Sequence, residues 1–176
     1  MRILLVVLVS ALLSGCTGAP ENVTPVTNFE LDRYLGKWYE IARLDHSFER
    51  GLEGVTAEYS LRDDGGVRVI NRGYAVEDAE WNEAEGKAYF VNDENSGFLK
   101  VSFFGPFYGS YIIFDLDQEN HQYSLISGPD TSYLWILART PTLSEDIKNK
   151  LIKQAKEAGF DTEQLIFPKP VPQTEK

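Results

Sequence analysis

The chain is poor in cysteine and histidine, and this scarcity excludes several kinds of chemistry. Among its 176 residues there is one cysteine, Cys16, and there are two histidines, His46 and His121, in separate loop-like segments. A single cysteine cannot form an internal disulfide, and without an HExxH, CxxC or His-rich cluster a zinc site is not expected. A P-loop, a dinucleotide fingerprint and the G-x-S-x-G motif are absent as well. The sequence therefore predicts no metal, no cofactor and no catalytic residues.

Basic charge and long apolar runs are also scarce. Lysine and arginine number 17 against 27 acidic residues, which gives a formal net charge of −10. A surface this acidic repels phosphates, so nucleic acid is excluded as a partner. Hydrophobic residues still make up 43% of the chain and aromatic residues 12%, enough for a folded core, and the length favours one domain.

The first residues have the features of a lipoprotein signal peptide. Met1-Arg2 is a short positive segment, and the apolar run Ile3 to Leu13 that follows has 11 residues, too few to span a bilayer. Leu13-Ser14-Gly15-Cys16 fits the bacterial lipobox, so we predict removal of residues 1–15 and acylation of Cys16 with chains such as palmitate. Thr17 stands where an aspartate would signal retention in the inner membrane. We therefore expect a lipid-anchored protein on the periplasmic face of the outer membrane.

The remaining chain divides by composition into three segments. Residues 16–27 are rich in proline, threonine and asparagine, which predicts a lipidated tether. Residues 28–170 form the domain, without repeats or a second unit. Pro168, Pro170 and Pro172 end the ordered structure, so residues 171–176 are expected to be a disordered tail.

Period-2 alternation runs through most of the domain and predicts strands. Val55 to Leu61 places apolar residues on every odd position, and Asp63 to Gly66 has the composition of a hairpin turn. Evenly spaced strands with short turns and no helix between them indicate an antiparallel sandwich or barrel. The eight candidate strands lie near residues 38–44, 55–61, 67–73, 81–90, 99–103, 111–116, 123–127 and 132–139.

Small residues on the inward faces favour a barrel over a sandwich. A sandwich core needs bulk at such positions to reach native packing density, whereas eight strands closed into a barrel leave room for one small ligand. The small inward residues are Ala42, Ala57, Ala84, Gly86 and Ala88. We therefore predict an all-β fold, an eight-stranded antiparallel up-and-down β-barrel enclosing a cavity.

One helix is expected after the barrel. Thr142 and Glu145 match a capping box, and Gly159 is a C-terminal stop. The apolar stripe between them, which includes Leu151 and Ala155, must be buried, and the outside of the barrel is its only partner. The sequence thus predicts a C-terminal α-helix packed on the outside of the barrel, with residues 165–167 as a further edge strand.

Three residues at the two ends of the barrel sequence form a structural signature. Gly36 permits a tight turn, Trp38 opens the first strand, and Arg139 ends the last. First and last strands are neighbours in a closed barrel, so the guanidinium should lie over the indole. Such a cation–π pair contributes about 0.5–2 kcal/mol.

Gly36-x-Trp38 with Arg139 resembles the lipocalin signature, and three longer runs resemble bacterial lipocalins of the outer-membrane lipoprotein branch. These runs are residues 38–44, 101–107 and 133–137, and the resemblance extends from about Asn28 to Phe167. One departure is Phe114-Asp115-Leu116, where many lipocalins have Thr-Asp-Tyr. The resemblance implies a lipocalin barrel that binds fatty acids or lysophospholipids and takes part in envelope maintenance.

The predicted ligand site is the wall and mouth of the barrel cavity. Parity places the Glu40 carboxylate inside, paired with Tyr59 or Tyr111 or oriented toward a ligand headgroup. Phe48 and Leu52 lie in a loop that either borders the mouth or packs on the barrel as a lid. The candidate ligand-binding residues are Glu40, Ala42, Phe48, Val55, Ala57, Tyr59, Val69, Ala84, Ala88, Leu99, Val101, Phe103, Tyr111, Tyr133 and Trp135.

The favoured function is non-covalent binding of a fatty acid or lysophospholipid, for storage or transport in envelope maintenance, by a protein that is not an enzyme. Two alternatives remain open. One is a lipocalin-fold enzyme acting on a lipidic substrate, and the other is a structural envelope lipoprotein with a filled barrel. The sequence does not decide between a monomer and a homodimer.

Replacement of Cys16 tests the anchor. We expect Cys16→Ser to release the protein from the membrane fraction or to leave its signal peptide uncleaved, because serine does not take the acyl chains that hold the protein. Envelope fractionation, together with the apparent size of the product, measures both effects. Normal maturation of a variant that stays in the outer membrane would contradict the lipobox interpretation.

Overall fold

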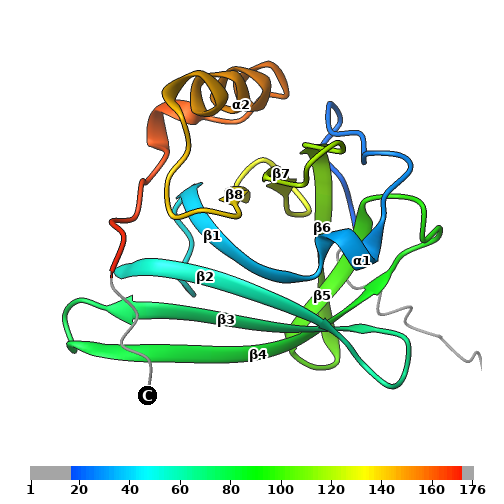
Figure 1. Cartoon of the computed structure of the whole chain (residues 1–176), viewed down its shortest axis with the longest axis horizontal. Coiled ribbons are helices and arrows are strands. Elements are labelled where there is room, and N and C mark those ends of the chain that lie inside the picture. The colour runs from blue at the N-terminus through cyan, green and yellow to red at the C-terminus, as the bar shows by residue number, and fades with distance from the viewer. Residues whose placement is uncertain (1–16, 172–176) are drawn as a thin grey trace, which may run out of the picture.

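The computed structural model describes residues 17–171, and its strands form one closed antiparallel barrel (Figure 1). Neighbouring strands follow the chain order, and the last pairs with the first, so the predicted eight-stranded up-and-down barrel is confirmed. The strands are β1 (Gly36–Arg43), β2 (Leu52–Leu61), β3 (Val67–Ala75), β4 (Glu80–Phe90), β5 (Phe98–Phe104), β6 (Phe107–Leu116), β7 (Tyr123–Ser127) and β8 (Leu134–Ala138). The predicted signal peptide and Cys16 lie outside the described residues.

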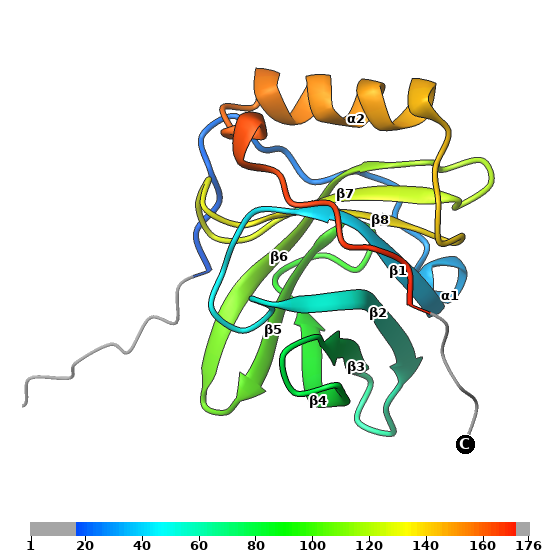
Figure 2. The same cartoon turned by 90° about the vertical axis from the view of Figure 1, so that its left-hand side faces the viewer.

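Three helical segments accompany the barrel: α1 (Leu31–Tyr34), α2 (Glu145–Glu157) and the short 3-10 helix η1 (Thr162–Gln164). Helix α2 lies across the outside of the barrel over β7 and β8, as predicted (Figure 2). Its N-cap is Ser144, whose hydroxyl accepts the Ile147 amide at 3.4 Å, so the predicted cap at Thr142 is wrong by two residues. No helix in the part of the chain that the structure describes is long and apolar enough to cross a membrane.

Two apolar cores lie on opposite faces of the wall formed by β7, β8 and β1. The outer core joins Leu151 and Ala155 of α2 to residues such as Ile136 of β8. The inner core fills one end of the barrel around Trp38. Because β7 and β8 are covered on both faces, nearly all their residues are buried and β8 is a continuous apolar run, while β3 has one solvent-exposed face and alternates.

The Trp38–Arg139 contact closes one end of the barrel. The Arg139 guanidinium carbon lies 4.0 Å from the centroid of the Trp38 ring, as expected for a cation–π pair. Trp38 is fully buried, and its indole N–H donates to the Tyr34 carbonyl at 2.8 Å. Gly36 has a φ of +91°, and a Cβ there would lie 3.5 Å from an Arg139 nitrogen, so glycine permits both the turn and the close approach.

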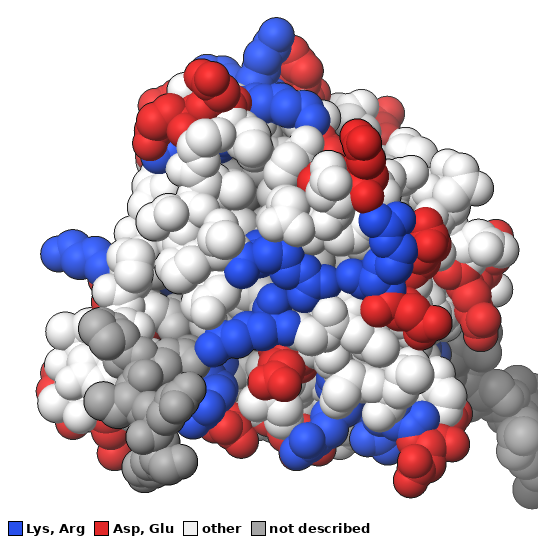
Figure 3. Space-filling view, in the orientation of Figure 1, with Lys and Arg blue, Asp and Glu red and all other residues white. Residues whose placement is uncertain are grey.

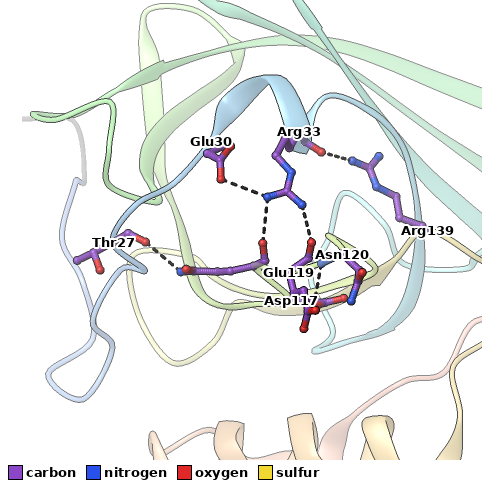
Figure 4. Close-up of polar contacts among 8 residues, drawn as sticks. Thr27, Glu30, Arg33, Asp117, Glu119, Asn120 and Arg139 are labelled. Atoms are coloured by element: carbon purple, nitrogen blue, oxygen red, sulfur yellow. Dashed lines mark hydrogen bonds and ion pairs between the residues drawn. The ribbon is translucent and has the colours of Figure 1, made fainter.

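The same end is fastened by a second arginine, drawn in Figure 4. Arg139 donates to the Arg33 carbonyl at 2.8 Å, and the Arg33 side chain in turn donates to the carbonyls of Gln118 and Glu119 at 3.1 and 2.6 Å. These contacts link α1 to the turn between β6 and β7. That turn is organised by Asp117, which accepts the amides of residues 120 and 122, each at 3.2 Å.

Asp115, the aspartate of the altered triplet, does not organise this turn. Its carboxylate lies 3.6 Å from the Lys150 ammonium of α2 and is only 14% exposed. The aspartate that this chain keeps from the usual triplet therefore ties β6 to the outer helix.

The segments before and after the barrel pack closely on it. The predicted tether differs from a free linker over its described part, because Val23 is buried and Val26 exchanges backbone hydrogen bonds with Ile113 and Gly97. At the other terminus, Ile166 forms an isolated bridge with Arg43 in place of the expected edge strand. The described chain thus follows the barrel wall at both ends.

Charges of both signs are distributed over the surface. Figure 3 shows Lys and Arg side chains crossing the middle of one face, with Asp and Glu side chains beside them. Arg68 pairs with Glu85 at 2.7 Å and Arg72 with Glu83 at 3.2 Å across β3 and β4. The net charge of −10 therefore does not form one continuous acidic surface on the face shown.

A double-mutant cycle measures the contact that closes the barrel. Trp38→Ala should lower the free energy of unfolding by about 3–5 kcal/mol, because it leaves a large cavity. Arg139→Ala should cost less, and the double variant should cost less than the sum, because both single variants remove the same contact. Denaturant unfolding of the four proteins gives the coupling energy, and strict additivity would rule the coupling out.

Candidate functional site

The barrel encloses a cavity of about 300 Å³ whose wall is mostly apolar. Tyr34 and Phe29 cover its closed end, and the loops after β1 and β7 surround the other. All but two of the predicted ligand-site residues lie on this wall. Those that do are Glu40, Phe48, Val55, Ala57, Tyr59, Val69, Ala88, Leu99, Val101, Phe103, Tyr111, Tyr133 and Trp135.

The two exceptions are Ala42 and Ala84, whose predicted places on the wall are wrong. A β-bulge between Glu40 and Ala42 breaks the alternation, and Ala42 is buried in the outer core. Ala84 is exposed because β4 pairs with β5 only from Lys87 onward, so the wall beside Ala84 has β3 on one side and no strand on the other. Strand alternation alone shows neither the bulge nor the unequal strand lengths.

At a third small residue, Gly86, a neighbouring side chain fills the space that the glycine leaves. A Cβ at Gly86 would lie 2.8 Å from the Phe103 ring, so the ring packs directly on the glycine. Ala88 differs, because it is 4% exposed, faces the cavity and pairs with Val101 across β4 and β5. Of the small inward residues, Ala57 and Ala88 are therefore the ones that leave room.

The wall also contains residues that the sequence analysis did not select. Val67 and Leu137 follow the same alternation as selected neighbours and could have been found by parity. Phe29, Leu31 and Glu49 reach the cavity from segments outside the barrel strands, and no local pattern indicates where such segments fold. The unselected wall residues are Phe29, Leu31, Tyr34, Glu49, Thr56, Val67, Asn71, Gly109, Ser110, Gly128, Pro129 and Leu137.

Three tyrosines form a polar cluster near the closed end. The Tyr111 hydroxyl lies 2.8 Å from the hydroxyls of both Tyr34 and Tyr59. Burial raises the pKa of Tyr34 to about 12 and the pKa values of Tyr59 and Tyr111 well above the usual range. The cluster is thus neutral and satisfies its own hydrogen bonds, so it is compatible with an apolar ligand chain.

Glu40 points inward as predicted, but its partner is neither Tyr59 nor Tyr111. The Arg43 guanidinium donates to the Glu40 carboxylate at 2.6 Å, and both side chains are about 2% exposed. The bulge permits this pairing, because it brings a residue three positions later onto the same side of β1. Arg43 also donates to the Glu49 carbonyl at 2.8 Å, which fixes the loop after β1.

Glu49 is the second buried carboxyl of this cluster. Its Oε2 accepts the Trp135 indole N–H at 3.0 Å and lies 2.9 Å from His46 Nε2. Burial acts to raise the pKa of Glu49, but the close His46 imidazole, the Trp135 hydrogen bond and the Arg43 cation hold it below the usual value. Burial raises the pKa of Glu40 well above its usual range, and the neighbouring Glu49 charge adds to this effect. The pair therefore favours a proton on Glu40 and a negative charge on Glu49.

Aromatic rings border the mouth beside this acidic pair. Phe48 is 59% exposed, stacks on Tyr133 with 6.2 Å between ring centroids and lies 4.1 Å from the His46 ring centroid. Its place on the cavity wall agrees with the predicted mouth position. Leu52, the other mouth candidate, is not on the wall and packs over Gly73.

Comparisons with known proteins agree with this geometry. The model of the lipocalin-like domain family matches residues 29–170. The chain is 63% identical over 167 residues to the outer membrane lipoprotein Blc of Vibrio cholerae, covering 95% of this chain and 98% of that protein. Identity to the Blc protein of Escherichia coli K12 is 55% over 148 residues, covering 84% and 83% of the two chains.

Solved structures support the same fold. Insecticyanin from the tobacco hornworm Manduca sexta superposes with a TM-score of 0.69 at 22% identity, with 86% of each chain covered. At this identity the likeness concerns the fold alone. Family match, sequence identity and barrel topology together show that the chain belongs to the lipocalin family, in the bacterial branch that the Vibrio and Escherichia proteins represent.

Proposed function

We propose that the protein holds one fatty acid or lysophospholipid in its barrel cavity, for storage or transport at the outer membrane. The observation that carries this proposal is a cavity with apolar walls and a single acidic cluster near its mouth. Its volume of about 300 Å³ is at the lower end of ordinary ligand sites, and each methylene buried there contributes about 0.8 kcal/mol. An acyl chain fits such walls, with its headgroup toward the polar end.

The acidic cluster favours the lysophospholipid over the free fatty acid. Glu40 and Glu49 line the cavity, whereas no lysine or arginine stands among its lining residues. The nearby cation, Arg43, is already held by Glu40 and by backbone carbonyls. A fatty-acid carboxylate placed here would face the Glu49 charge without a counter-ion, while the ammonium of a zwitterionic headgroup would be attracted.

The two alternative functions have less support. A structural lipoprotein with a filled barrel has no need of the empty space beside Ala57 and Ala88. For an enzyme, the wall offers a carboxyl pair but no serine or cysteine beside a histidine base, the arrangement that activates a nucleophile. Binding accounts for both the cavity and its acidic cluster.

The lipobox and the relatives support a site of action at the outer membrane. The similar Vibrio and Escherichia proteins are named outer membrane lipoproteins. Together with the lipobox ending at Cys16 and the Thr17 that follows, this supports a protein anchored by acyl chains to the periplasmic face of the outer membrane.

Filling the cavity tests the binding proposal. Ala88→Trp should weaken lysophospholipid binding at least tenfold, about 1.4 kcal/mol, because the indole occupies the space of the acyl chain. Ala84→Trp is the matched control, since this alanine is on the same strand but exposed and away from the wall. Calorimetric titration measures affinity, and unfolding curves measure overpacking. Equal affinity of both variants and wild type, or a wild type that takes no lipid, would overturn the proposal.

The acidic pair makes a separate prediction about pH. Because the pKa of Glu40 is raised in the folded protein, its contribution to stability is full below about 4.5, the ordinary value, and is lost as pH rises through the raised pKa. Glu49, with its lowered pKa, contributes above 4.5 and loses that contribution as pH falls through the folded value. Glu40→Gln should therefore flatten the decline of stability above pH 4.5, whereas Glu49→Gln should flatten the acid side.

Stability at neutral pH distinguishes the same two variants. Glu49→Gln should be the more destabilising, because Arg43 loses a nearby negative charge, whereas glutamine resembles a protonated Glu40. Urea unfolding of both variants between about pH 3 and pH 8 provides the measurement. Identical pH profiles would show that the proton is not assigned as described.

A further inference from the structure

We propose that the open end of the barrel docks on the surface of a lipid bilayer through the hairpin tip Phe104-Gly105-Pro106-Phe107, so that ligand passes directly between membrane and cavity. This inference rests on the proposed lipid-binding function and adds the surface through which the lipid arrives.

The tip exposes two large apolar side chains. Phe104 is 78% exposed and Phe107 is 73% exposed, more than any other large hydrophobic residue in residues 17–171. The two rings are directly opposite each other, as register partners of β5 and β6. Burying a phenylalanine side chain is favourable, so two rings left in water forgo stability that a purely structural turn could keep.

The tip belongs to the end of the barrel where the cavity opens. Connections after β1, β3, β5 and β7 meet at this end, and two of them carry the further exposed residues Phe48 and Val76, at 59% and 57%. The wall residues Phe103 and Gly109 lie one and two positions from the tip, so the tip continues the cavity wall outward. Leu61, similarly exposed at 58%, lies at the opposite end beside the β2–β3 turn.

The chain enters the fold at this same end. The Ser110 hydroxyl, on the cavity wall, donates to the Gly18 carbonyl at 2.6 Å, and Gly18 also lies against the Pro129 backbone of the β7–β8 loop. In Figure 2 the start of the described chain, the loop after β1 and the β5–β6 hairpin lie together on the left-hand side. Cys16 is two residues before Gly18, and two residues span at most about 7 Å. Acyl chains on Cys16 would therefore begin beside the open end.

Charge and shape favour a lipid bilayer as the docking partner of the hairpin tip. Residues 101–114 contain no charged side chain, so inserting the tip requires no charge to leave water. Two rings on a narrow hairpin suit shallow insertion among lipid headgroups, where aromatic side chains are favoured, better than a flat protein interface. The short distance to the anchor brings this surface to the membrane at high effective concentration.

Depth-dependent quenching tests the orientation. The full-length acylated protein carrying Phe104→Trp is inserted through its own anchor into phosphatidylcholine vesicles with brominated acyl chains, and Leu61→Trp is the matched control for the opposite end. The emission that Phe104→Trp adds over the wild type should fall at least twofold in the brominated vesicles. The emission that Leu61→Trp adds should not fall. Equal quenching at both positions, or quenching at 61 alone, would overturn the docking surface.

Lipid transfer tests its role. The double variant Phe104→Ser/Phe107→Ser should take up a fluorescent lysophospholipid from vesicles at least tenfold more slowly than Leu61→Ser, while its affinity for the same lipid dispersed as monomers stays unchanged. An unchanged uptake rate with intact affinity would sink the docking proposal and leave lipid binding standing. If the wild-type protein itself did not bind the dispersed lysophospholipid, the proposed binding function would be wrong instead. A wild-type dimer in sedimentation that becomes monomeric in the double variant would assign the tip to a second copy and contradict the proposal.

Discussion

The contact between Trp38 and Arg139 is the constraint on which the rest of the structure depends. These residues are about a hundred positions apart, and they meet only if β8 returns to β1 and closes the sheet. The guanidinium also binds the carbonyls of Lys37 and Arg33, so one side chain fastens both the last strand and the short helix α1. Closure therefore seals one end of the barrel, and any ligand must enter at the other.

Sealing one end gives the molecule its functional polarity. The closed end is held by hydrogen bonds to backbone carbonyls and by the neutral cluster of Tyr34, Tyr59 and Tyr111. The open end has the acidic pair, the exposed rings of the mouth and the point where the chain enters the barrel. If the proposed lipid binding and the predicted anchor are both correct, the one open end faces the surface that holds the anchor. Fold and proposed function are connected through this asymmetry.

Most of the fold could be predicted from the sequence, because alternation, turn composition and the Trp38–Arg139 pair are local or pairwise signals. The site was predicted less completely, and the errors have common physical causes. Ala42 was misplaced because a bulge is set by pairing with β8, and Ala84 because the wall at that point depends on the length of β5. Glu49 was missed because it reaches the cavity from a loop whose path is fixed by the buried Arg43. Register, strand length and loop path are tertiary properties that a single strand does not encode.

The acidic pair is difficult to explain by stability alone. Removing charged groups from water is costly, and apolar side chains of similar size often replace a buried ion pair without loss of stability. A barrel that needed only a packed interior would be served by such residues at positions 40, 43 and 49. Here the carboxyls of Glu40 and Glu49 instead line the cavity, where Arg43 holds Glu40, and Trp135 and His46 hold Glu49. In the proposed binding mode the headgroup of a bound lipid lies beside these carboxyls, and selection among headgroups would then account for an arrangement that stability alone does not require.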